Sequence, residues 1–273
     1  MLSETMDRFI ELAHENKKAG LNTDINEQKK YAVISTPRCG SKMLCDLLAR
    51  NELGWPSEWF NMRYIQQYLN KKNMNTLDMK VYLDDLITAT ASPNTKILGV
   101  NFHIDQYQAF LNKKIDLLNL GFDAVYYIKR RDIVRQAYSF AKAMNSELWS
   151  KDMEKRAGFT TTPEITITPE DFLRALNKIY NDRLYFENKI KTKTDRIFIY
   201  EDIIQDGLHT CITRIRQDLD LPDTETVYAN PGLKKQSGHF DESQLETILA
   251  ELGLEERTGE DTTSAETRER QTS

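Results

Sequence analysis

A short turn at residues 36–42, with the sequence TPRCGSK, carries residue types that bind a phosphate or a sulfate. Positive charge, a hydroxyl and backbone amides would come from Arg38, Cys39, Gly40, Ser41 and Lys42. The turn follows a β-branched run and precedes a helical pattern, so its amides and the positive end of the helix dipole would face one point. We therefore expect an anion site here; an ordinary strand-to-helix turn is the alternative.

The turn lacks the spacing of a nucleoside-triphosphate loop. In the pattern GxxxxGK[ST], with Gly40 as the second glycine, position 35 would be glycine and position 41 lysine, but both are serine. The turn holds a single glycine, which excludes the dinucleotide pattern GxGxxG. The run YYIKRRD is basic before Asp132, so this strand does not end in the acid that holds Mg²⁺ in such enzymes. These departures favour an anion site without a metal.

A second basic segment, KRRD, follows the apolar run at residues 124–128. Arg130 would stand at the end of a strand and Ser139 on the next helix, where both could reach one phosphate. Open α/β sheets bind ligands at the carboxyl ends of their strands, which favours a binding role. The alternative is a solvated charge cluster.

The sequence predicts that alternating strands and helices position these residues. The expected strands are residues 31–36, 96–102, 124–128 and 196–200, each followed by a helical pattern. Strands that alternate with helices predict a mostly parallel central sheet with helices on both faces, a three-layer α/β fold like that of P-loop proteins.

We expect one domain over residues 1–254. Residues 1–20 have the spacing of an amphipathic helix, and Thr168 has the following Pro-Glu-Asp of a capped helix start. Residues 145–168 are polar with Gly158, a run of threonines and Pro163, which predicts a surface excursion near the site. Residues 255–273 have almost no apolar side chains and are expected to be disordered.

Composition excludes several classes of function. The net charge is −5 with no basic stripe, which argues against a nucleic-acid partner. The three cysteines form no CxxC pair and no zinc spacing, as expected for thiols in a reducing compartment. The sequence shows neither a signal peptide nor an apolar stretch of membrane-spanning length, so we expect a cytoplasmic protein.

Four ordered segments resemble one family. The turn PRCGSKML resembles the 5′-phosphosulfate loop of sulfotransferases, and WPSEWF, IKRRDIVRQAYSF and PGLKKQS follow at fitting spacings over residues 29–252. Within that superfamily the chain is similar to the bacterial trehalose sulfotransferase family and to nodulation-type and lipopolysaccharide sulfotransferases. The resemblance implies transfer of a sulfuryl group from 3′-phosphoadenosine 5′-phosphosulfate to a hydroxyl, on a carbohydrate or glycolipid acceptor. It also suggests a homodimer.

The resemblance assigns roles to residues. Glu58 takes the position of the general base, and its aromatic neighbours would raise its pKa; a helix-start acid is the alternative. Arg38 would stabilise the leaving oxygen, and Arg130 with Ser139 would hold the 3′-phosphate. The remaining assignments are nucleotide closure by Lys235 and Gln236, and acceptor contacts by Trp59, Phe60, Asn101 and His103. Trp59 and Phe60 suit the core equally well.

Two residues depart from the family's pattern. Lys42 stands where a threonine or serine is usual, and Asn101 where a lysine is common. His103 is a second candidate base, although a strand-end histidine is more often structural. Tyr200-Glu201-Asp202 also resembles a family signature, interpreted as structural. The alternatives to a sulfotransferase are a family member that binds nucleotide without catalysis, and a small-molecule kinase on the same fold, which would need Mg²⁺ and ATP.

Overall fold

The protein is described by a computed structural model, whose described residues fall into two compact units. The first unit comprises Met1–Gln136 and Asn177–Lys235, and the second comprises Ala137–Leu176 and Gln236–Ser273. The structure describes residues 2–20, 28–91, 96–146, 149, 165–205, 207–222, 228 and 241–254. Within these ranges no helix combines the length and apolarity needed to cross a bilayer. The single domain expected over residues 1–254 stays a prediction.

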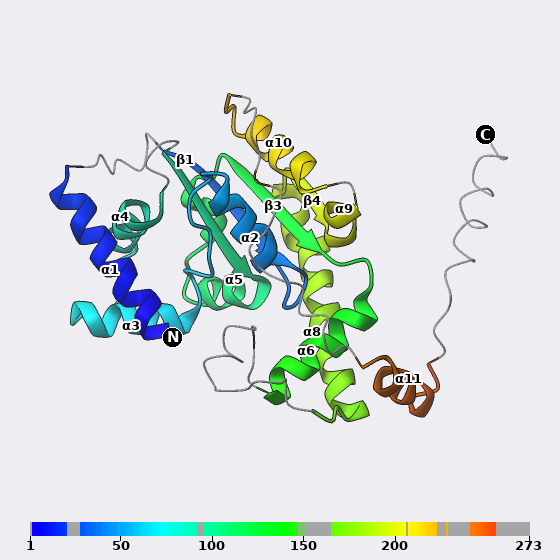
Figure 1. Cartoon of the computed structure of the whole chain (residues 1–273). Helices are drawn as coiled ribbons and strands as arrows, with labels where there is room; N and C mark the ends of the chain where they lie inside the picture. Colours follow the sequence, from blue (N-terminus) through cyan, green and yellow to red (C-terminus); the bar gives the residue numbers. More distant parts are fainter. Residues whose placement is uncertain are drawn as a thin grey trace. The chain divides into compact units, whose positions relative to one another are not determined.

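A parallel sheet forms the centre of the first unit (Figure 1). Its order is β2-β1-β3-β4, and the strands are β1 (Lys29–Ser35), β2 (Ile97–His103), β3 (Ala124–Lys129) and β4 (Arg196–Ile199). All four lie where the β-branched runs predicted them. The inner strands are nearly continuously buried, as expected when both faces of a parallel sheet are covered.

Side chains of β1 alternate between two separate cores. Ala32 and Ile34 belong to one core, and Tyr31 and Val33 to the other. The first core is covered by α1 (Leu2–Lys18), α3 (Met62–Lys72), α4 (Met79–Thr90) and α5 (Ile104–Leu111). Side chains of the short helices η2 (Leu117–Leu120) and η3 (Phe186–Ile190) also belong to it, and η4 (Lys191–Lys193) follows η3 directly. The second core is covered by α2 (Ser41–Arg50), α9 (Tyr200–Gln205) and α10 (Leu208–Asp218). The predicted three-layer α/β arrangement is confirmed.

The N-terminal helix α1 is amphipathic, as its sequence indicated. Met6 and Phe9 are fully buried in the first core. At the other end of the helix, Lys17 Nζ lies 2.5 Å from Oδ1 of the buried Asp85 on α4. This anchors α1 against α4 beside the sheet, as Figure 1 shows.

The second unit holds the later part of α6 (Ile133–Ser146), the earlier part of α8 (Pro169–Tyr185), and α11 (Glu242–Glu251). Thr168 and Asp171 bond reciprocally at the start of α8, as the capping motif predicted. Tyr138 donates to Oε1 of Gln244 at 2.8 Å, which ties α6 to α11. Most of the expected excursion at 145–168, and the whole tail from 255, lie outside the described residues.

Candidate functional site

The parallel sheet brings the predicted segments to one edge. Ser35 of β1 is aligned with His103 of β2 and with Ile128 of β3, and Lys129 of β3 is aligned with Ile199 of β4. The turn after β1, the start of α5, Arg130 and Tyr200 therefore all leave the sheet at its carboxyl edge. Ligand sites in open α/β sheets form at this edge.

The turn between β1 and α2 has a backbone that requires glycine. Arg38 has φ 62° and Gly40 has φ 95°, both in the left-handed region. A Cβ on Gly40 would lie 2.3 Å from Cδ2 of Tyr200, closer than any real contact. Gly40 is the N-cap of α2, and no side chain caps this helix start. The positive end of the α2 dipole is therefore not offset by a capping side chain.

Side chains of the turn point in different directions. Cys39 is fully buried in the second core. Burial raises the pKa of the Cys39 thiol, although hydrogen bonds from Ser41 and Thr36 act in the opposite sense. Lys42 is exposed and Arg38 is half-buried. Cys39 can thus offer a ligand only its backbone, and the charge comes from Arg38 and Lys42.

A buried amide and a guanidinium hold the turn to the rest of the sheet. Gln136 Nε2 donates to Thr36 Oγ1 at 2.8 Å and to the Pro37 carbonyl at 2.6 Å. Arg183 Nη2 donates to Gln136 Oε1 at 2.9 Å and to the Arg130 carbonyl at 2.5 Å. One side chain of α8 thereby joins the end of β3 to the turn after β1. Nothing in the sequence marks these long-range contacts, so neither residue was predicted for the site.

Arg130 lies beside the same turn. Its guanidinium Cζ is 5.2 Å from the ring centroid of Tyr200, and its Nε is 3.4 Å from Glu201 Oε1. Since the Tyr200 ring also packs against Gly40, it lies between Arg130 and the turn. The Tyr200-Glu201 pair, interpreted from sequence as structural, thus orders both basic segments.

Glu58 lies on the segment between α2 and α3, beside the end of β2. The backbone N–H of Asn101 donates to the Ser57 carbonyl at 2.9 Å, which fixes this segment to the strand. The Glu58 side chain is 35% exposed, and its Oε1 lies 3.8 Å from His103 Nε2. Oε2 accepts hydrogen bonds from Gln106 at 2.7 Å and from Asn61 at 3.2 Å. Neither of these amides was predicted from the sequence.

The expected raised pKa of Glu58 is wrong. Burial does raise the pKa of this carboxyl, but four groups act against it: the charge of His103, hydrogen bonds from Asn61 and Gln106, and the charge of Lys42. Together they lower the pKa of Glu58 below its usual value. The polar and charged neighbours therefore outweigh the aromatic ones that flank Glu58 in the sequence.

Glu58 interacts electrostatically with Lys42 and Cys45 of α2. Lys42 is one of the charges that lower the pKa of Glu58. The pKa of the Cys45 thiol is raised first by burial and then by the charge of Glu58. The carboxylate thus lies within electrostatic reach of the helix that the predicted anion turn begins.

Three of the expected acceptor residues need correction. Trp59 and Phe60 are fully buried, so they are core side chains and not a surface for a sugar ring. Trp59 packs on Phe9 with ring centroids 5.2 Å apart. Asn101 is also buried, and its Oδ1 accepts a hydrogen bond from Ser35 Oγ at 3.0 Å, so it links β2 to β1. Of the four, only His103 lies beside Glu58 with a partly exposed side chain.

The described residues do not show where the other predicted nucleotide-binding residues lie relative to the turn. Ser139 is half-buried on α6 in the second unit, and its pairing with Arg130 stays a prediction. Lys235 and Gln236 lie outside the described residues.

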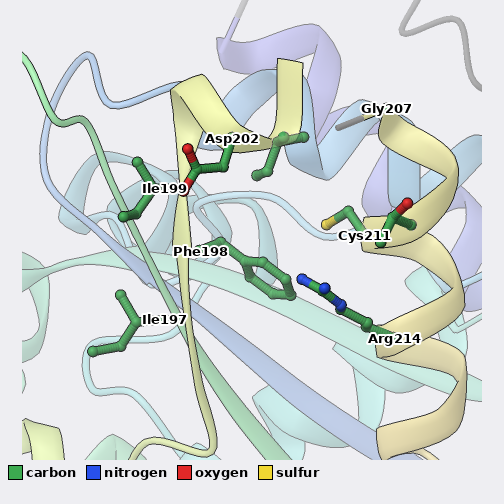
Figure 2. Close-up of a pocket in the computed structure, with 9 residues that line it drawn as sticks. Ile197, Phe198, Ile199, Asp202, Gly207, Cys211 and Arg214 are labelled. Atoms are coloured by element: carbon green, nitrogen blue, oxygen red, sulfur yellow. The ribbon is translucent and has the colours of Figure 1, made fainter. Parts of the chain in front are cut away.

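A small pocket of about 130 Å³ lies against β4 (Figure 2). Asp202 of α9 and Cys211 and Arg214 of α10 face the strand there. The full lining is Ile197, Phe198, Ile199, Asp202, Ile203, Gly207, Thr210, Cys211 and Arg214. It contains none of the residues predicted for the site, so we assign the pocket no role in the chemistry.

Comparisons with known proteins give a family and a distantly similar solved structure. A family model described as Stf0 sulphotransferase matches residues 30–166. A crystal structure of a sulfotransferase from Alicyclobacillus acidocaldarius is similar with a TM-score of 0.43 and 10% identity, covering 84% of this chain and 97% of that chain. No curated protein matches the chain.

Proposed function

The chain belongs to the Stf0 sulphotransferase family, and from that premise we propose that it moves a sulfuryl group from 3′-phosphoadenosine 5′-phosphosulfate to a hydroxyl of a carbohydrate or glycolipid. Family membership supports sulfuryl transfer in general. The observation that supports the finer proposal is that the segment carrying Glu58 is bonded to β2 near its carboxyl end, at the same edge of the sheet as the turn after β1. The charge of Lys42, at the start of α2, also acts on this carboxylate.

The residues around the turn suit the donor. A 5′-phosphosulfate needs several hydrogen-bond donors in a small space. The start of α2 supplies backbone N–H groups there, because it follows a glycine and has no capping side chain. Arg38 and Lys42 would add charge to this cradle. In this proposal Arg130 and Ser139 bind the 3′-phosphate, and Lys235 and Gln236 close over the nucleotide. The donor, when bound, supplies an activated sulfur, and no metal is needed.

The proposed reaction is a single in-line displacement. Glu58 removes the proton of the acceptor hydroxyl as its oxygen bonds to sulfur, and the bond from sulfur to the 5′-phosphate oxygen breaks. Arg38 and the amides at the start of α2 stabilise the charge that gathers on that leaving oxygen. One hydrogen-bond donor of this kind typically stabilises the transition state by about 3 to 4 kcal/mol.

The lowered pKa of Glu58 has a consequence for this mechanism. The carboxylate is ionised at neutral pH and is ready to accept a proton, although it is a weaker base than one with a raised pKa. The acid limb of the pH profile of kcat/KM should therefore fall below the ordinary glutamate pKa of about 4.3.

The test is Glu58→Gln, with the exposed Glu246→Gln on α11 as the matched control. Loss of the base should reduce turnover about 100-fold or more. Calorimetry with adenosine 3′,5′-bisphosphate should show unchanged binding, because Glu58 is assigned to the acceptor side. Turnover would be followed with radiolabelled donor on a panel of disaccharides and glycolipids. Normal turnover in Glu58→Gln would refute the base assignment.

A further inference from the structure

Two side-chain amides converge on one oxygen of Glu58. Gln106 Nε2 lies 2.7 Å from Oε2, and Asn61 Nδ2 lies 3.2 Å from the same atom. The two amides come from the starts of two different helices, since Gln106 lies in the first turn of α5 and Asn61 is the N-cap of α3. Both are good donors to an ionised carboxylate, and they therefore bind it in one orientation.

The orientation of the Asn61 amide is fixed by a helix cap. Asn61 is the N-cap of α3, and its Oδ1 accepts the backbone N–H of Arg63 at 3.0 Å. Only the carbonyl oxygen of an amide can accept this bond. Its NH₂ group must then point the other way, toward Glu58. The cap settles which end of the amide faces the carboxylate, a choice that atomic positions alone leave open.

Gln106 is oriented in the same way at the start of α5. Its Oε1 accepts the backbone N–H of His103, the N-cap residue, at 3.2 Å. The NH₂ group is thus the end that reaches Glu58 Oε2. Gln106 is largely buried, so water does not compete easily for either end of its amide. Each amide serves a helix start with its oxygen and the carboxylate with its nitrogen.

The other carboxylate oxygen is left without such a bond. Oε1 lies 3.8 Å from His103 Nε2 of β2, which exceeds hydrogen-bond length, and no hydrogen bond from the described residues reaches it. Lys42 and Cys45 of α2 and Tyr64 of α3 act on Glu58 only through charge. Oε1 and Oε2 are therefore chemically different.

We propose that Asn61 and Gln106 are positioning residues that hold Oε2 of Glu58, so that Oε1 is the oxygen that receives the proton of the acceptor hydroxyl. This inference rests on the proposed function. It also restricts the acceptor, because the attacking hydroxyl must approach from the His103 side of the carboxylate. The amides contact neither acceptor nor donor and act only through Glu58.

The test removes the NH₂ groups and leaves the base in place. Asn61→Ser keeps a good helix cap but loses the NH₂ group that reaches Glu58, leaving only a shorter hydroxyl, and Gln106→Met keeps the length of the side chain without any donor. Gln108→Met, two residues further along α5, is the matched control. In both variants the acid limb of kcat/KM should move to higher pH, because burial is no longer opposed by the lost hydrogen bond. Binding of adenosine 3′,5′-bisphosphate should not change.

A second measurement separates this inference from the proposed function. In protein labelled with ¹³C at the glutamate carboxyl, the Glu58 signal is assigned by its loss in Glu58→Gln and is then titrated. Its pKa should rise in Asn61→Ser and in Gln106→Met but not in Gln108→Met. Equal titration in all three variants would overturn the inference. Absence of sulfuryl transfer would instead overturn the proposed function, and full turnover of Glu58→Gln would overturn the base assignment, while the titration would still report on the two amides.

Discussion

Gly40 combines two constraints at a single residue. Its φ of 95° is accessible to glycine and strained for other residues, and the Tyr200 ring occupies the space where a Cβ would lie. The Arg130 guanidinium also lies over this ring, 5.2 Å from its centroid. A side chain at position 40 would therefore disturb both basic segments of the candidate site at once.

Gly40→Ala should destabilise the protein and weaken donor binding. The positive φ costs about 1 to 2 kcal/mol for an alanine, and the overlap with Tyr200 adds about 1 to 3 kcal/mol. Chemical unfolding measures the loss of stability, and calorimetry with adenosine 3′,5′-bisphosphate measures the weaker binding of the nucleotide.

Gly207→Ala is the control for this prediction. Gly207 has a similar φ of 90°, and no atom lies within 4 Å of the place that its Cβ would take among the described residues, so only the backbone cost applies. Equal destabilisation by the two changes would show that the contact with Tyr200 is unimportant. Combining Gly40→Ala with Tyr200→Ala should recover the part of the loss that is due to overlap.

At the scale of elements, Asp85 joins three helices. It lies on α4, and its buried carboxylate contacts Lys17 of α1 and both Tyr68 and Lys72 of α3. Burial would raise the pKa of Asp85, but the hydrogen bonds from Lys17, Lys72 and Tyr68 lower it below the usual value. The ionised form is thus favoured by folding, and it stabilises the packing of α1 and α3 against α4.

Asp85→Asn should reduce the free energy of unfolding by about 1 to 3 kcal/mol at neutral pH, because a buried hydrogen-bonded charge is lost. A carboxyl with a lowered folded pKa contributes its full stability above its unfolded pKa, and this is lost as pH falls through the folded pKa. The wild type should therefore lose more stability than the variant between about pH 5 and pH 3.

Urea unfolding at neutral and acidic pH measures this difference. Asp84→Asn is the control, since the adjacent Asp84 is only half-buried, and its effect should stay within about 0.5 kcal/mol. A parallel loss of stability with falling pH in the wild type and in Asp85→Asn would contradict the assignment.

At the scale of the whole molecule, the sheet and its two cores were predictable, whereas the details of the site were not. Runs such as YAVIS at β1 specify a buried strand locally, through β-branched and aromatic residues. The direction of the Glu58 pKa shift depends on His103 and Lys42, which approach only in the folded chain. Sequence neighbours alone suggested the opposite direction.

The roles of the capping and aromatic residues could not be predicted from the sequence either. Asn61 and Gln106 look like ordinary helix starts in the sequence, and the second use of their amides follows from the position of Glu58 between α3 and α5. Trp59 and Phe60 have the composition of either a core or a binding surface, and only their packing on Phe9 and Phe102 decides for the core.

Donor binding should stabilise the whole protein. Adenosine 3′,5′-bisphosphate at 100 times its Kd should add about 2.7 kcal/mol to the free energy of unfolding, with or without EDTA. Adenosine 5′-monophosphate, which lacks the 3′-phosphate, should add much less, and thermal unfolding measures both. Stabilisation by ATP only with Mg²⁺ would favour a kinase, and stabilisation by the bisphosphate without any transfer would favour a family member that binds but does not catalyse.

The pairing of strands also governs when the site can form. Because β1 pairs in parallel with both β2 and β3, each partner must arrive over a long stretch of chain, and no local hairpin can nucleate the sheet. Such non-local topologies fold slowly, since the entropy of closing the loops is lost before the contacts form. During synthesis, the turn at residues 36–42 would leave the ribosome well before Arg130 and Tyr200. It would therefore lack these two neighbours, and could not form the complete candidate site, until β3 and β4 docked.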